Sequence, residues 1–155
     1  MSNIKYHFER TTILHTDYKK ILSDRIAAVC RKIGFDDSGV TWIIFEPDKR
    51  QGRCVIYNIM NEFDGRNYGF CIPSRKEIWI STISILGARY ALPGSRIYDI
   101  VKLPGMYKTD ILTKVILDEI THIQTNRDHG SREYDAKLSE NAARYYSSPM
   151  WRFLA

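Results

Sequence analysis

The segment Thr109–Thr125 restricts the fold of this 155-residue chain more than any other part of the sequence. Its apolar residues recur at three- and four-residue steps and cover most of the circumference of a helix. They are Ile111, Leu112, Val115, Ile116, Leu117, Ile120 and Ile123. A helix that is apolar on nearly all sides is packed inside a domain. We therefore expect a buried helix here, with the other elements around it.

The remaining segments predict an α+β domain around this helix. Residues 16–33 have helical spacing and end before Gly34, a residue suited to terminate a helix. A last helix is predicted over residues 131–146. Short runs rich in β-branched and aromatic residues, bounded by turn residues, predict the strands of one small, mostly antiparallel sheet. These runs are Val40–Glu46, Arg53–Met60, Tyr68–Ile72 and Glu77–Ile83.

The glycines and prolines of residues 87–107 predict an irregular excursion, a candidate lid or groove wall. The whole chain, 1–155, then forms a single domain with its core at about 16–146 and a C-terminal tail at 147–155.

Composition and charge exclude several classes of protein. Hydrophobic residues make up 44% of the chain, enough for a core, and no stretch reaches the ~18 apolar residues of a membrane span. The net charge of +5 is spread thinly, which disfavours a dedicated nucleic-acid domain. The cysteines, Cys30, Cys54 and Cys71, are widely spaced and form no CxxC pair. They predict reduced core residues and a cytoplasmic, reducing location.

Two acids and a histidine interrupt the apolar faces of the buried helix. Asp118 and His122 lie four residues apart on one stripe, and Glu119 lies on the neighbouring stripe. Burying such groups without partners costs about 1–3 kcal/mol each, and more for a charge. A chain reversal at His129–Gly130 would bring a third ligand back to the same place. The alternative is an ordinary charge pattern on a partly solvated helix face.

The run Val115–His122, followed by His129–Gly130, resembles the active helix of zincin-type zinc metallopeptidases. In that pattern, His-Glu-x-x-His supplies two zinc ligands and a general base, and a later residue supplies the third ligand. The chain is most similar to SprT-like and minimal gluzincin-like domains, in element order over 16–146 and in residues over about 115–138. The resemblance implies that His122 and His129 bind zinc and that Glu119 takes a proton from water.

Asp118 stands where this family has its first histidine. A carboxylate oxygen binds zinc at about 2.0–2.2 Å, so Asp118 can serve as a ligand, although its charge makes the metal a weaker Lewis acid. Two histidines and a carboxylate also describe the ligand set of non-haem iron enzymes. The sequence thus leaves open zinc, another divalent metal or no metal.

The resemblance further implies a substrate groove along the strand Glu77–Ile83, where Trp79, Ile80 and Ser81 would contact an extended polypeptide added as a strand. The leading expectation is a zinc-dependent peptidase. Its rival is a catalytically degenerate zincin-like fold that serves as a structural subunit of a virion or another large assembly. Association with nucleic acid is a third expectation, because SprT-like proteins often act near DNA.

Other residues have structural interpretations. His7 and His15 have no ligand in register and are expected to be surface or capping residues. Tyr134 and Leu138 are expected to be core contacts that hold the loop after the motif. The pair Arg127–Asp128 either supports His129 or forms loop surface.

Overall fold

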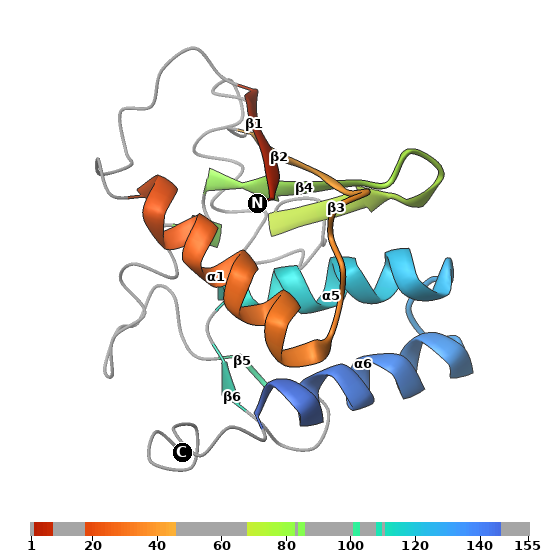
Figure 1. Ribbon diagram of the computed structural model, residues 1–155. Coiled ribbons are helices and arrows are strands. Elements are labelled where there is room, and N and C mark those ends of the chain that lie inside the picture. The colour runs from red at the N-terminus through yellow and green to blue at the C-terminus, as the bar shows by residue number, and fades with distance from the viewer. Residues whose placement is uncertain are drawn as a thin grey trace, which may run out of the picture.

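A computed structural model describes residues 2–7, 18–45, 68–82, 84–85, 101–102, 108–109 and 111–146 (Figure 1). Within these residues, three helices and a four-stranded sheet form a mixed α and β fold, as predicted. The helices are α1 (Tyr18–Ile33), α5 (Ile111–Thr125) and α6 (Arg132–Tyr145). The strands of the sheet are β1 (Asn3–His7), β2 (Thr41–Phe45), β3 (Gly69–Ile72) and β4 (Glu77–Ser81). A 3-10 turn, η2 (Pro73–Arg75), joins β3 to β4, and β5 (Val101–Lys102) pairs with β6 (Lys108–Thr109).

The strand order of the sheet is β1-β2-β4-β3. The pairs β1–β2 and β2–β4 are parallel, and only β3–β4 is antiparallel. The prediction of a mostly antiparallel sheet is therefore wrong for the described residues. The physical reason is that α1 connects β1 to β2 as a crossover, which parallel strands require. The segment Asn3–His7 was not predicted as a strand, although its alternation of polar and apolar residues is a strand signal.

Most other predicted elements are confirmed. The runs Val40–Glu46, Tyr68–Ile72 and Glu77–Ile83 contain β2, β3 and β4, and all three predicted helices are present. Gly34 follows α1 with a φ of 72°, a left-handed conformation that glycine adopts without strain. Three predicted regions lie outside the described residues: the strand Arg53–Met60, most of the excursion at 87–107, and the tail at 147–155.

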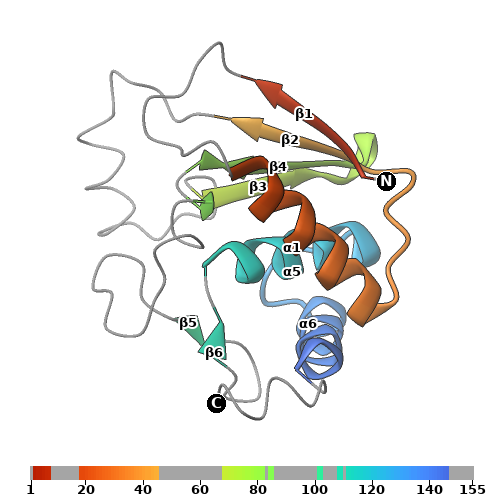
Figure 2. The same ribbon diagram turned by 60° about the vertical axis from the view of Figure 1, so that its left-hand side comes forward.

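The buried helix is confirmed as α5, and all three helices lie on one side of the sheet (Figures 1 and 2). Helix α5 packs against β3, β4, α1 and α6. Its residues Leu112, Ile116 and Ile120 are fully buried, together with Leu22 and Ile26 of α1. The helix that carries the polar motif is thus surrounded by the core on most sides.

A polar contact fixes α6 against the second half of α5. Asn141 is buried, and its Nδ2 donates to Thr121 Oγ1 at 3.0 Å and to Gln124 Oε1 at 2.8 Å. At the other end of α6, Ser131 Oγ accepts a hydrogen bond from the backbone N of Tyr134 at 3.1 Å and caps the helix. The two contacts set where the loop between α5 and α6 lies.

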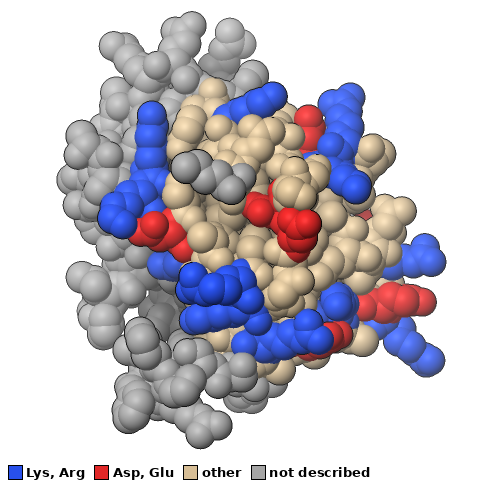
Figure 3. Space-filling model, viewed as in Figure 1, with Lys and Arg blue, Asp and Glu red and all other residues tan. Residues whose placement is uncertain are grey.

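The surface of the described residues carries charges of both signs close together. Figure 3 shows basic side chains interspersed with acidic and uncharged ones. Lys20 pairs with Asp24 at 2.7 Å, and Arg144 pairs with Glu140 at 2.9 Å. Among the helices described, none is long and apolar enough to cross a bilayer.

Candidate metal centre

Asp118, His122 and His129 come together at the C-terminal half of α5. His122 Nε2 lies 3.1 Å from His129 Nε2 and 3.8 Å from Asp118 Oδ1. His129 Nε2 lies 3.7 Å from Asp118 Oδ2. One potential ligand atom from each residue lies within 4.8 Å of the other two. The structure therefore brings the three predicted ligands to one point.

Local backbone geometry explains this convergence. Asp118 and His122 are one helical turn apart, so both side chains leave α5 on the same face. After the helix, Asn126 has a φ of 51° and its N donates to His122 O at 2.7 Å, which ends α5. Gly130 has a φ of 87°, a value that glycine adopts most easily. These two left-handed residues turn the chain so that His129 faces back toward α5.

The backbone also selects the tautomer of the neutral His122 ring. His122 Nδ1 lies 2.7 Å from the carbonyl oxygen of Arg127, which can only accept a hydrogen bond. The neutral ring must therefore carry its proton on Nδ1, which leaves a lone pair on Nε2. That lone pair faces His129 and Asp118. Arg127 thus supports His122 through its backbone, whereas the sequence left open either a support of His129 or a place on the loop surface.

The donor set and its spacing fit a divalent cation. Ligand atoms bound at about 2.0–2.2 Å to one tetrahedral zinc ion lie about 3.3–3.6 Å apart. The separations of 3.1, 3.7 and 3.8 Å fall on both sides of this range. The side chains of Asp118 and His122 are 13% and 12% exposed, and that of His129 is 65% exposed. One side of the centre is therefore open to solvent, as a catalytic site requires.

Glu119 lies beside the centre in an apolar environment. It is only 4% exposed, and its carboxyl group shares a hydrogen bond with the thiol of Cys71 on β3. Burial, and then the negative charge of Asp118, raise the pKa of Glu119 to about 8. Burial also raises the pKa of Asp118, although the two histidines oppose this change. The folded environment of the metal-free protein therefore favours the protonated form of Glu119.

Two residues at the centre were not predicted as parts of it. The Cys71 thiol faces Glu119, and burial followed by the charge of Glu119 raises its pKa above the ordinary range. The ring of Tyr134 contacts both His122 and His129. For Cys71, strand alternation was the available signal: Phe70 and Ile72 point to one face of β3, so Cys71 must point to the opposite face.

The other cysteine described, Cys30, lies in the core as predicted, and burial raises its pKa to about 12. Cys54 and His15 lie outside the described residues. His7 ends β1. Leu138 packs against the core, as predicted.

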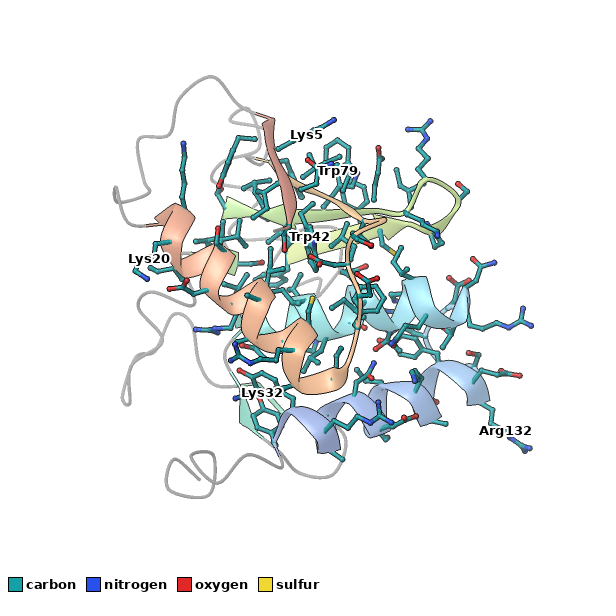
Figure 4. All side chains as sticks on the ribbon, viewed as in Figure 1. Lys5, Lys20, Lys32, Trp42, Trp79 and Arg132 are labelled. Carbon is teal, nitrogen blue, oxygen red and sulfur yellow. The ribbon has the colours of Figure 1, made fainter. Side chains whose placement is uncertain are left out.

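The predicted substrate strand has a different place in the sheet. β4 is hydrogen-bonded to β2 on one side and to β3 on the other, so a polypeptide cannot add to it as a strand. The expectation of strand addition along Glu77–Ile83 is therefore wrong. Ile80 and Ser81 are fully buried. Trp79 points away from the helices and stacks on Phe70, with ring centroids 5.3 Å apart (Figure 4).

No protein-family model, curated protein or solved structure matches this chain. The resemblance to zincins therefore stays a prediction from the residues of the motif.

Proposed function

We propose that this protein is a metal-dependent hydrolase that cleaves peptide bonds, with a centre formed by Asp118, His122 and His129. The observation that carries the proposal is the approach of three ligand atoms to within 4.8 Å of one another. Two imidazoles and one carboxylate are a donor set that catalytic zinc sites use. Zinc is therefore the first cation to test, followed by iron(II) and manganese.

A bound cation would supply Lewis acidity, which polarises a carbonyl group and acidifies water. The chain's own residues have separate tasks. His122 presents a lone pair because Arg127 O holds the proton on the other nitrogen. Asp118 offsets part of the positive charge. Glu119 is the residue suited to take a proton on its carboxylate and return it to the leaving amine. A cation beside Asp118 would counter the negative charge that raises the pKa of Glu119.

The proposed substrate class is polypeptide, and the strand that supports it is β3. β3 is the last strand of the described sheet on the side next to α5, which it contacts. An edge strand recognises extended polypeptide through backbone hydrogen bonds. Cys71 ties this strand to Glu119, so a polypeptide bound along β3 would lie near the proton-transferring group.

Asp118 itself favours a second candidate function. A carboxylate at the first ligand position lowers the Lewis acidity of a bound metal. The fold would then be a catalytically inactive relative of the zincins with a structural role in a larger assembly. The two candidates differ in one property, the turnover of a polypeptide by the metal-loaded protein.

The test begins with metal binding. The chain is stripped with chelator, reconstituted with zinc, and analysed by mass spectrometry of the metal and by calorimetry. We expect one zinc ion per chain, and loss of binding in His122→Ala and Asp118→Asn. Asp24→Asn is the matched control, because Asp24 is an exposed acid paired with Lys20 on α1. Cleavage of an unfolded protein then separates the two functions. Failure to bind zinc, iron or manganese stoichiometrically would reject the metal centre.

A further inference from the structure

Tyr134 contacts both histidines of the candidate centre at once. Its ring stacks on His122 with centroids 4.5 Å apart and an interplanar angle of 24°. It meets His129 nearly edge-on, with centroids 4.7 Å apart and an angle of 68°. The two imidazoles also contact each other, with centroids 4.6 Å apart. The three rings thus form one aromatic cluster built from α5, the loop after it and α6.

His129 depends on this cluster for its position. Its side chain is 65% exposed and lies in a turn, where an imidazole is otherwise free to change rotamer. Its described contacts are His122, Asp118 and the ring of Tyr134. Tyr134 is only 1% exposed, and its backbone N is bound to the capping residue Ser131. The buried ring of Tyr134 therefore limits the rotamers of the exposed His129 side chain.

The ring of Tyr134, rather than its hydroxyl group, makes these contacts. The hydroxyl oxygen is buried and has no hydrogen-bond partner among the described residues. An unpaired buried hydroxyl contributes nothing favourable to the position of the histidines. Replacement of Tyr134 by phenylalanine would keep the ring and remove only this group.

We propose that Tyr134 is a positioning residue that fixes the rings of His122 and His129 before a cation binds. This inference rests on the proposed function, because positioned histidines matter only if they bind a metal. The positioning itself is a property of the metal-free protein. By stacking on His122, Tyr134 keeps Nδ1 aimed at the carbonyl of Arg127 and Nε2 aimed at the centre. By contacting His129 as well, it keeps the two Nε2 atoms at their 3.1 Å separation.

The experiment compares three variants with the parent chain in two measurements. Long-range proton–nitrogen correlation spectra give the tautomer of each histidine in the metal-free protein, at a pH where both rings are neutral. Competition with a chromophoric chelator gives the zinc affinity. Tyr134→Phe keeps the ring, and Tyr134→Leu removes it. Leu138→Ala is the control for stability, because Leu138 lies one turn farther along α6 and packs on the core.

We expect Tyr134→Phe to match the parent in both measurements. In Tyr134→Leu, His122 should lose its single Nδ1–H tautomer, and zinc affinity should fall by about 10–100-fold, as for other groups that orient metal ligands. Leu138→Ala should lower the melting temperature and leave the tautomer and affinity unchanged. If Tyr134→Leu does not fold, Tyr134→Met, which fills the same space without a ring, takes its place.

The outcomes separate this inference from the proposed function. A Tyr134→Leu protein with the parent tautomer and the parent zinc affinity would overturn the positioning role while the metal centre stands. A parent chain that binds no metal, but whose His122 tautomer changes in Tyr134→Leu, would reject the metal centre and support the positioning role. If the parent binds no metal and Tyr134→Leu keeps the parent tautomer of His122, both the metal centre and the positioning role are rejected.

Discussion

Gly69 is the position where a single methyl group should most disturb the packing of β3 on α5. A Cβ atom built at Gly69 would lie 2.5 Å from Val115 Cγ1 and 2.8 Å from the backbone oxygen of Trp79. Both distances are too short for real carbon contacts, and the Trp79 oxygen belongs to the paired strand and cannot rotate away. Inserting atoms into a packed core costs about 1–3 kcal/mol. Because one of the two contacts is backbone, we expect Gly69→Ala to lose about 2–3 kcal/mol.

The free energy of unfolding is measured by urea denaturation followed by circular dichroism. The expected loss corresponds to a fall of roughly 5–10 °C in melting temperature for a chain of this size. Gly39→Ala is the matched control, since a Cβ at Gly39 would meet only the Lys76 side chain, at 3.9 Å. Adding Val115→Ala to Gly69→Ala should restore little stability, because the Trp79 contact remains. If Gly69→Ala is as stable as Gly39→Ala, the close approach of β3 to α5 is wrong.

Three further predictions test the polar groups of α5 and α6. In the metal-free protein, the pKa of Glu119 is about 8, against about 4.3 in the unfolded chain, so the folded state binds the extra proton between these values. The free energy of unfolding should therefore fall as pH rises from about 4.3 to about 8. Glu119→Gln should flatten this pH dependence of stability in melting curves. An equally steep pH dependence in the variant would contradict the raised pKa of Glu119. Asp118→His should raise zinc affinity relative to manganese in parallel titrations, because imidazole suits zinc and carboxylate suits manganese; an unchanged ratio would place residue 118 outside the ligand set. Asn141→Ala removes the hydrogen bonds to Thr121 and Gln124 and should lower the free energy of unfolding by about 1–2 kcal/mol in urea denaturation. Ala143→Gly lies on the exposed face of the same helix, so its loss of about 1 kcal/mol comes from helix propensity alone.

The sequence was most informative where a pattern is local. The apolar spacing of 109–125 predicted a buried helix because every residue of the pattern lies on the same element. The approach of Asp118 and His122 follows from helix geometry alone. The position of His129 was predictable only as a chain reversal, since Gly130 and Asn126 indicate a turn without giving its direction.

The parts that were missed depend on contacts between distant segments. The parallel pairing of Asn3 with Thr41 joins residues that no local pattern connects. The Cys71–Glu119 contact exists because β3 packs across α5, an arrangement set by the whole core. Tyr134 was correctly predicted to be buried, but its double contact with the histidines required the path of the loop.

The unequal anchoring of the three ligands has a kinetic consequence. Asp118 and His122 belong to α5, whose amides should exchange with solvent only when the whole domain unfolds, because α5 contacts both the sheet and the other helices. His129 belongs to an exposed turn, a kind of segment that opens locally at much lower free energy. An ion held by all three could then leave by opening of the turn alone. Its residence time would report the opening rate of the 126–131 loop, and not the lifetime of the folded protein.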